Sequence, residues 1–196
     1  PAAARRVLIV GPDPDQLINH LAAARLDLEL FAAPSNDQPD DLLPRAARVH
    51  PHRDAQAVAI DPGSIDCLLI REPLGQADDP EGLPRRFRPL LAADGVLVGA
   101  VANLQHHARL AALLSGDLPP DGSFGQSFSI PGMLKLLLDA GFAPEIAGVV
   151  ESPAPLPLIA AVGPLLDHLG LHRDRTADRL NVAEVLLRGT PVADAD

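Results

Sequence analysis

The chain has 196 residues, 47% of them hydrophobic, which suits a single globular domain with a substantial core. Its net charge of -10 disfavours phosphate backbones and anionic membrane surfaces, so we expect neither nucleic acid nor a membrane as a partner. A single cysteine, Cys67, excludes an internal disulfide framework and a Cys-rich zinc site, and it makes the cytoplasm the expected compartment.

We expect neither a membrane-spanning helix nor a signal peptide in this sequence. No apolar run approaches the roughly 20 residues that a membrane-spanning helix needs, and no signal-peptide core follows the first residues. The chain begins at Pro1 rather than Met, so we expect it to be trimmed or cut from a longer protein.

The first half of the chain begins with a short apolar run that ends in glycine. Val7–Val10 predicts a buried strand that ends at Gly11, and Asp13 can cap a following helix. The apolar side chains of that helix fall on one face, at Leu17, Ile18 and Leu21. Further on, the sequence predicts a strand at Leu28–Phe31, a polar loop at Asn36–Asp41 and a short helix at Leu42–Ala47.

The second half alternates short apolar runs with helical patterns. Strands are expected at Cys67–Ile70, Val96–Val101, Ile146–Val150 and Asn181–Leu187. Helices are expected at Glu81–Leu91, Leu104–Leu114, Pro131–Ala140 and around Leu165–Leu169. Ala93–Gly95 is typical of a turn, while Ser129 and Gly141 are typical of the two ends of the Pro131–Ala140 helix.

This alternation predicts an α/β fold: a doubly wound, mostly parallel sheet with helices on both faces. We expect one domain over residues 1–196, with an irregular or helical excursion at 152–180 before the last strand. Ligands of such sheets bind beyond the carboxyl ends of the strands. The predicted site segments are therefore Gly11–Gln16, Ala32–Asn36, Asp54, Arg71–Leu74 and Ala102–His107.

Several segments contain short sequence motifs whose order along the chain is that of a known protein family. Asp54–Ile70 contains an acid, a turn similar to "PxGSFD" and an apolar strand. Ala77–Val98 is similar to "DPxxxLxxxxRLLxPGGxLV", and Ala102–Asn103 stands where a "PN" pair ends a strand. Phe128–Phe142 is similar to "FTxxxLxxLLxxAGF", and Leu186–Pro191 to "VVRGxxP". Together these segments resemble the class I S-adenosylmethionine (SAM)-dependent methyltransferases over nearly the whole chain.

The nearest subgroup is that of methyltransferases found beside, or fused to, glycosyltransferases in surface-polysaccharide pathways. The resemblance implies SAM as the cofactor, held by Gly11 and Asp13 after the first strand. It also implies that Asp54 contacts the adenine amino group and that Glu72, just past the strand at Cys67–Ile70, faces the site. Solvated loop or strand-end carboxylates are the alternative interpretation of Asp54 and Glu72.

The cofactor motif is incomplete in this chain. The family turn is "GxGxG", but the turn here keeps only Gly11, and Pro12 and Pro14 remove two backbone donors. The family also has an acid at the end of the second strand, where this chain has Ala32 and Ala33. Glu29 lies earlier and would need a different strand register. An ordinary turn capped by Asp13 is the alternative to a cofactor turn.

His106 and His107 follow the strand at Val96–Val101, where the resemblance implies a general base for methyl transfer to oxygen. Two surface residues at a helix start are the alternative. The "HxRFFT" segment of the subgroup is represented by Phe124–Ser129, which lacks its His and Arg. His50 and His52 have no third ligand partner, so no metal site is expected, and Cys67 is expected in the core.

Three functions remain open at this point. The first is a SAM-dependent methyltransferase that acts on a small molecule or a glycan. The second is a catalytically inactive methyltransferase-like domain that serves as a binding or scaffolding module for a protein partner. The third is a nucleotide-binding Rossmann protein of another kind, which is weakened because the turn after Gly11 is no dinucleotide fingerprint.

Overall fold

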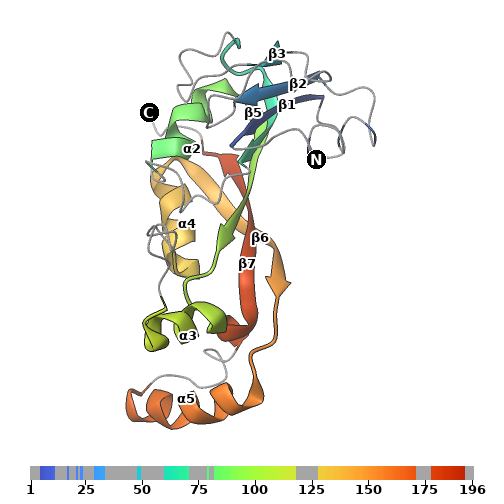
Figure 1. Cartoon of the computed structure of the whole chain (residues 1–196). Coiled ribbons are helices and arrows are strands. Elements are labelled where there is room, and N and C mark those ends of the chain that lie inside the picture. Colours follow the sequence, from blue (N-terminus) through green and yellow to red (C-terminus); the bar gives the residue numbers. More distant parts are fainter. Residues whose placement is uncertain are drawn as a thin grey trace.

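The computed structural model describes residues 5–11, 17, 21, 23, 29–33, 48–49, 60–70, 79, 82–117, 128–170 and 178–192. Its seven strands form one sheet in the order β3-β2-β1-β4-β5-β7-β6 (Figure 1). They are β1 (Arg6–Val10), β2 (Glu29–Ala33), β3 (Arg48–Val49), β4 (Ile65–Ile70), β5 (Leu91–Ala102), β6 (Phe142–Glu151) and β7 (Val182–Pro191). The expected α/β fold is confirmed.

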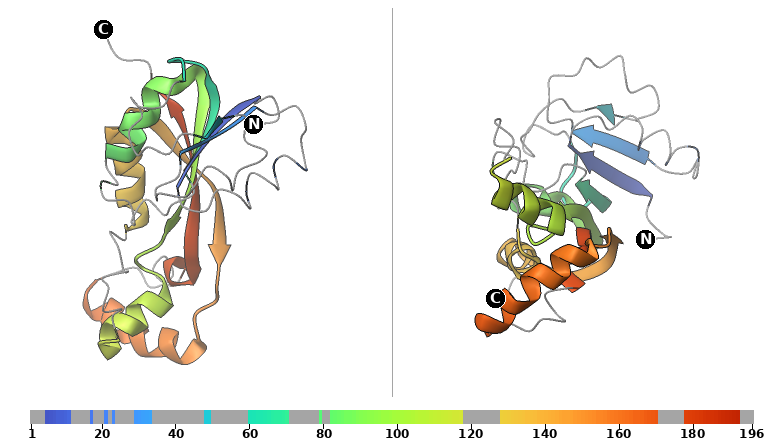
Figure 2. Two further views of the ribbon diagram at one scale, coloured as in Figure 1. Left: turned by 45° about the horizontal axis from the view of Figure 1, so that its top comes forward. Right: turned by 60° about the horizontal axis from the view of Figure 1, so that its bottom comes forward.

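The sheet has a parallel half and an antiparallel half. β1 pairs with β2 and β4 in parallel, β2 with β3, and β4 with β5. β7 then inserts antiparallel between β5 and β6. β5, β6 and β7 have 12, 10 and 10 residues, against five or six for β1, β2 and β4, so this half of the sheet is elongated (Figure 2).

Four longer helices accompany the described strands: α2 (Gly82–Phe87), α3 (His107–Ser115), α4 (Ile130–Asp139) and α5 (Leu156–His168). α2 and α4 lie against one face of the sheet (Figure 1). Between them and the strands lies a continuous apolar core, whose largest fully buried side chains include Phe87, Phe142, Leu68 and Leu97. Burial of such side chains contributes about 1.5–3 kcal/mol each.

The predicted strands form, with shifted ends. Strands at Val7–Val10 and Leu28–Phe31 correspond to β1 and β2, while Ile146–Val150 underestimates β6 by several residues at its start. The sequence did not predict β3, because a strand of two residues is too short to show an apolar pattern. Leu17 and Leu21, predicted on one helix face, are both helical and half-buried. The polar loop 36–41, the short helix 42–47 and Ile18 lie outside the described residues.

The turn predicted at Ala93–Gly95 forms, but it lies inside β5 as an irregular bulge. Between two paired positions, Ile65↔Leu91 and Cys67↔Val96, β4 advances two residues while β5 advances five. A Cβ at Gly95 would lie 2.9 Å from two backbone oxygens, those of Ala92 and Ile65. Gly95 therefore lies against a residue three positions earlier, as in a tight turn, and glycine allows this close backbone approach inside the bulged strand.

Helix ends also differ from the prediction for local reasons. The helix predicted at Glu81–Leu91 is a six-residue α2 followed by a 3-10 turn at Arg88–Leu90, because Pro89 cannot supply an α-helical backbone donor. α3 begins at His107 rather than Leu104, because the Asn103 side chain accepts a hydrogen bond from Gln105 N and forms a turn first. The predicted cap of α4 is confirmed, since Ser129 Oγ accepts from Gly132 N.

Gly141 follows α4 with φ of +82°, a conformation that favours glycine. Before β7, the predicted excursion contains a 13-residue helix, α5, which starts within the proline-rich stretch rather than near Leu165. The assignment of residues 1–196 to one domain stays a prediction.

Candidate functional site

The carboxyl ends of β1, β2 and β4 lie level with one another at one edge of the sheet. Val10 pairs with Ala33 on one side and with Ile70 on the other, and Ile70 pairs with Gly99 of β5. In open parallel sheets, this edge is where ligands bind. The site segments predicted from the sequence are expected at this edge.

Gly11 follows β1 directly and is buried, with φ of +131°. A side chain at this φ would be strained, so the turn after β1 depends on glycine. The other predicted cofactor-binding residues, Asp13, Asp54 and Glu72, lie outside the described residues, as do His50 and His52. Their roles stay predictions.

The end of β2 carries Ala32 and Ala33 and therefore no carboxylate. Glu29 is the first residue of β2, and its backbone pairs with Arg6 at the opposite end of β1. Ala33 lies four positions after Glu29, which is about 13 Å along the strand at the usual rise. The different register that Glu29 would need to reach the ligand edge is not formed.

β5 extends beyond this edge and delivers the two histidines. Its last residue, Ala102, lies three positions past Gly99, the partner of Ile70, which is about 10 Å further along the strand. His106 then occupies the N-cap position of α3, and His107 is its first helical residue. Their ring centroids lie 4.2 Å apart with planes tilted by 47°.

His107 is held by the chain that follows β6. Its Nε2 lies 3.1 Å from the carbonyl oxygen of Ser152, and because a carbonyl only accepts, Nε2 donates. This hydrogen bond selects the tautomer with a proton on Nε2, which leaves Nδ1 as the proton acceptor of a neutral ring. His107 thus connects the start of α3 with the end of β6.

The pKa of His106 is lowered from its usual value of 6.5. Burial is the main cause, and the neighbouring His107 and the charge of Arg109 act in the same direction. The Ser152 carbonyl partly opposes them by favouring the protonated ring. Within the described part of the chain, the buried Nε2 of His106 has no hydrogen-bond partner. A neutral, half-buried imidazole of this kind is suited to accept a proton.

Asn103 is fully buried and holds the segment between β5 and α3 in place. Its Nδ2 donates to the carbonyl oxygens of Arg179 and Val182, at 2.8 and 2.9 Å. Its Oδ1 accepts from Gln105 N at 3.0 Å, and its own N–H donates to Ala183 O. From the sequence, Asn103 stood out by its resemblance to a "PN" pair and as part of the predicted site segment Ala102–His107, but its burial and its distant backbone partners left no local signal.

Asn181, one residue before β7, makes the matching contacts to the chain after β6. Its Oδ1 accepts from Ala154 N at 2.8 Å, and its carbonyl oxygen accepts from Ser152 N at 2.7 Å. The ends of β5 and β6 and the start of β7 are therefore joined through the buried amide of Asn103 and the partly buried amide of Asn181. The structure brings His106 and His107 together here, whereas Gly11 lies two strands away, about 10 Å laterally.

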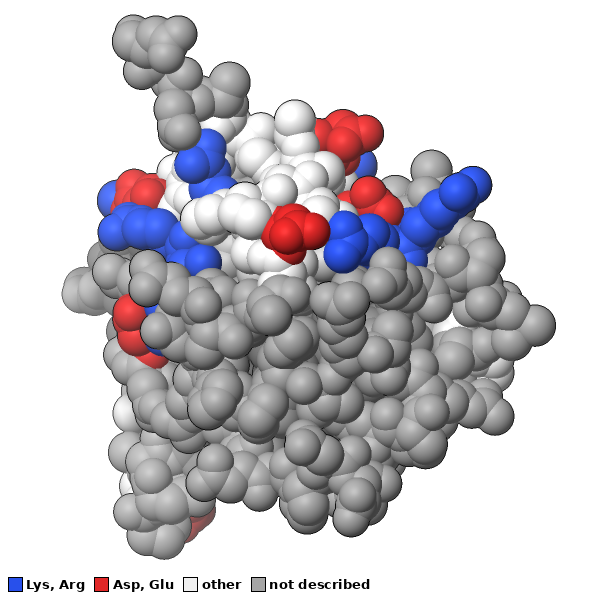
Figure 3. Space-filling view, turned by 90° about the horizontal axis from the view of Figure 1, so that it is seen from above, with Lys and Arg blue, Asp and Glu red and all other residues white. Residues whose placement is uncertain are grey.

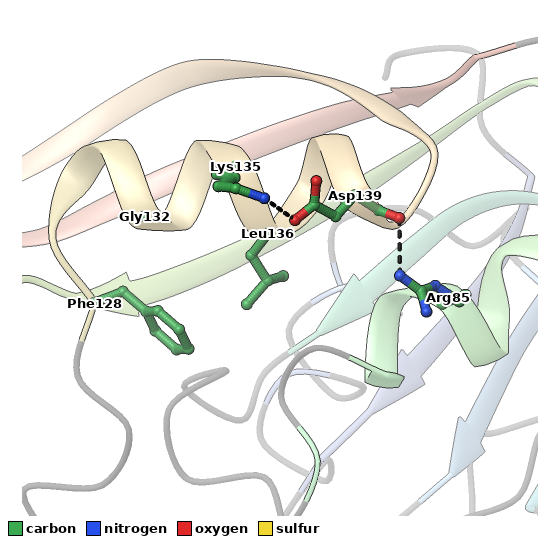
Figure 4. Close-up of a pocket in the computed structure, with 6 residues that line it drawn as sticks. All are labelled: Arg85, Phe128, Gly132, Lys135, Leu136 and Asp139. Atoms are coloured by element: carbon green, nitrogen blue, oxygen red, sulfur yellow. Dashed lines mark hydrogen bonds and ion pairs between the residues drawn. The ribbon is translucent and has the colours of Figure 1, made fainter.

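A separate groove of about 300 Å³ lies between α2 and α4 (Figure 4). Phe128, Gly132 and Leu136 contribute its uncharged lining. Arg85 donates to the carbonyl oxygen of Asp139 at 2.9 Å, and the carboxylate of Asp139 pairs with Lys135. The groove lies on the face of the sheet that α2 and α4 cover (Figure 1).

The described residues hold no group of three or more side chains that could ligate a metal ion. None of the described helices is long and apolar enough to cross a bilayer. Seen from above, the described part of the surface intermixes basic and acidic side chains around an uncharged area (Figure 3). It presents no continuous surface of one charge.

Comparison with solved structures identifies the fold class. No protein-family model matches the chain, and no curated protein sequence does. A SAM-dependent methyltransferase from Thermotoga maritima is 14% identical and matches 96% of this chain and 82% of its own, with a TM-score of 0.60. The fold of this chain is that of class I SAM-dependent methyltransferases.

Two further similar structures were solved with the cofactor or its product bound. The plantazolicin methyltransferase BpumL, in complex with S-adenosylhomocysteine (SAH), is 13% identical over 97% of this chain and 77% of its own, with a TM-score of 0.61. Phosphoethanolamine N-methyltransferase 2 from Haemonchus contortus, in complex with SAM, is 12% identical over 97% of this chain and 49% of its own, with a TM-score of 0.57. At such identities the similarity establishes the fold alone.

Proposed function

We propose that this chain is a SAM-dependent methyltransferase that acts on a small molecule or a glycan. The observation that carries the proposal is the sheet itself: its strand order, with β7 antiparallel, and the level ends of β1, β2 and β4 beside Gly11. Similar sheets in BpumL and the Haemonchus contortus enzyme accompany bound SAH and SAM.

The residues at this edge fit the cofactor in part. Buried Gly11, at φ +131°, gives a turn without a Cβ, which a backbone approach to the cofactor requires. Asp13, Asp54 and Glu72 are the further residues that we propose to contact it. The end of β2 offers no carboxylate for ribose hydroxyls, so we expect weaker cofactor binding than a complete site would give.

When bound, SAM supplies an electrophilic methyl group. Transfer of that group to an oxygen acceptor is accelerated by positioning and by removal of the acceptor proton. We propose His106 or His107 as the general base that removes this proton. His106 is suited by its lowered pKa, and His107 by the Ser152 carbonyl that orients its ring. The acceptor would lie between the end of β5 and the edge beside Gly11.

Isothermal titration with SAM and SAH is the direct test of cofactor binding. We expect micromolar to millimolar affinity, and Asp54→Ala should weaken binding by about 1–3 kcal/mol, the usual cost of losing a hydrogen bond to a charged group. Asp117→Ala is the matched control, because Asp117 is an exposed acid beyond the end of α3. Equal affinity of Asp54→Ala and the unmodified chain would remove Asp54 from the site.

The histidines are tested by SAH release with a panel of hydroxylated small molecules and oligosaccharides. If His106 is the base, His106→Gln should slow turnover at least tenfold and leave SAM affinity nearly unchanged. The same comparison applies to His107→Gln. A loss of SAM affinity without loss of turnover at saturating SAM would assign the residue to binding instead.

A second candidate function is a catalytically inactive binding module. The alanines at the end of β2 favour it, as do the two prolines after Gly11. Its signature would be no heat and no thermal shift with millimolar SAM or SAH. That result would refute the methyltransferase proposal and direct the search to a protein partner.

A further inference from the structure

The chain that follows β6 contacts both His107 and the residue that precedes β7. The carbonyl oxygen of Ser152 is the partner of His107 Nε2 at 3.1 Å, although 45 positions of sequence separate the two residues. The local chain around His107 therefore does not place this carbonyl. Whatever holds the Ser152 carbonyl in position also decides how the imidazole ring of His107 is oriented.

Asn181 binds the chain on both sides of that carbonyl. Its own carbonyl oxygen accepts from Ser152 N at 2.7 Å, and its Oδ1 accepts from Ala154 N at 2.8 Å. The Ser152 carbonyl lies in the chain between these two anchored amides. Pro153 follows it directly, and proline has a fixed φ, lacks a backbone N–H and restricts the residue before it. One asparagine thus fixes the short stretch of chain that presents this carbonyl to His107.

Asn103 in turn holds the backbone around Asn181. Its Nδ2 donates to the carbonyl oxygens of Arg179 and Val182, which stand on either side of Asn181 in the sequence. Asn103 is fully buried, so water does not compete for these hydrogen bonds. The hydrogen bonds form a circuit that leaves the connection between β5 and α3 at Asn103 and returns to it at His107. The ring of His107 is therefore positioned by three segments of chain that are distant in sequence.

The two neighbouring histidines differ in this respect. A neutral imidazole has one N–H and one bare nitrogen, so a carbonyl that accepts from Nε2 of His107 leaves Nδ1 bare and able to accept a proton. The buried Nε2 of His106, in contrast, has no hydrogen-bond partner in the described part of the chain. The hydrogen-bond geometry therefore favours His107 as the ring whose basic nitrogen is set in advance.

We propose that Asn181 is a positioning residue for His107: through the Ser152 carbonyl it keeps the ring proton on Nε2, so that Nδ1 acts as the general base. The catalytic part of this inference rests on the proposed methyltransferase function. The acceptor oxygen forms its bond to the methyl carbon as the carbon–sulfur bond breaks, and its proton passes to Nδ1. The products are the methyl ether, SAH and an imidazolium whose Nε2–H still donates to Ser152.

Proton–nitrogen NMR of the full 196-residue chain, labelled with ¹⁵N, observes the ring without any substrate. The chain has seven histidines, and the ring signal that His107→Gln removes is that of His107. At about pH 8.5, where an ordinary imidazole is neutral, we expect a bare Nδ1 and an Nε2 proton that exchanges slowly with water. Asn181→Ala removes the acceptor of Ala154 N, so this exchange should become roughly tenfold faster. Asn181→Asp keeps an oxygen at that place and should retain the slow exchange.

Turnover at saturating SAM is the second measurement. Asn181→Ala should lower kcat roughly tenfold without changing the KM for SAM, and Asn181→Asp should restore most of that loss. Asp66→Ala is the matched control, because its Oδ2 accepts from the backbone N–H groups of Arg5 and Arg6 near the start of β4, the end of that strand opposite the candidate site. It should lower Tm but change neither the exchange of the His107 proton nor kcat.

Two results would overturn the positioning role of Asn181. One is an Nε2 proton of His107 that exchanges as slowly in Asn181→Ala as in the unmodified chain. The other is an Asn181→Asp chain with native circular dichroism whose Nε2 proton exchanges as fast as in Asn181→Ala. If the unmodified chain transfers no methyl group, the proposed function fails, and the exchange measurement still decides whether Asn181 positions His107.

Discussion

The strongest structural prediction concerns Asn103, because all of its side-chain hydrogen-bonding groups are buried and paired. Asn103→Ala removes three hydrogen bonds, those with Arg179 O, Val182 O and Gln105 N. At about 1 kcal/mol each, the free energy of unfolding should fall by about 3 kcal/mol. For a chain of this size that corresponds to a decrease of about 6–12 °C in Tm.

Differential scanning calorimetry, with chemical unfolding as a second measurement, checks this magnitude. Asn181→Ala is the matched control: its side chain accepts one hydrogen bond, from Ala154 N, so a decrease of about 2–4 °C is expected. Asn103→Asp should be less stable than Asn103→Ala at neutral pH, since it directs a buried carboxylate at two carbonyl oxygens. A Tm for Asn103→Ala within about 2 °C of the unmodified chain would refute the reasoning.

Three further predictions follow from the core, the bulge and the lowered pKa of His106. Gly95→Ala should destabilise the fold by about 1–3 kcal/mol, because the new Cβ would lie 2.9 Å from two carbonyl oxygens. Gly99→Ala is the control, because its Cβ would make only ordinary contacts and should not destabilise the fold. Similar urea midpoints for the two variants would contradict this prediction. Because the pKa of His106 is lowered by burial from 6.5, the unfolded chain binds this proton more readily than the folded one. Stability should therefore fall as pH drops below about 6.5, and His106→Gln should reduce that slope in a Tm series from about pH 7 to pH 5. Cys67, whose thiol pKa is raised mainly by burial, should react with a thiol reagent at pH 8 only as fast as the chain unfolds; rapid labelling of the native chain would show that β4 is accessible.

The local part of the fold was accessible to sequence analysis because its signals are local. Val7–Val10 and Cys67–Ile70 are short, strongly apolar runs, and both became central parallel strands. Ser129 was predicted as a helix cap because a hydroxyl at that position can accept from the first turn, and it does. The ends of helices and strands were harder to predict where contacts with residues distant in the sequence decide them.

The region at Ala93–Gly95 illustrates that limit. Asp and Gly in succession are typical of a turn, and the chain does turn tightly here, but no local feature shows that the turn lies inside a strand. β5 pairs with β4 at Leu91 before this turn and at Val96 after it, and the nearby Ile65 carbonyl makes glycine necessary. A strand that pairs from 26 residues earlier in the sequence thus makes the turn a bulge within β5.

For the candidate site, the sequence identified residue types but not their relative positions. It singled out Gly11, His106 and His107, and it expected the edge of the sheet on which the ends of β1 and β4 meet. It could not show that β5 overhangs this edge, nor that the Ser152 carbonyl fixes His107. Burial lowers the pKa of His106, and burial of a residue at a helix start depends on segments folded against it from elsewhere in the chain.

By itself, then, the sequence determined most of the strands and helices, the negative net charge and the incomplete glycine turn, because each depends on composition or on residues close together in the chain. The tertiary structure decided the insertion of β7 between β5 and β6, the buried amide contacts of Asn103 and the exposure of the apolar α5. Those features arise from strand pairing and packing between distant segments. An apolar helix has the same sequence pattern whether or not another surface covers it.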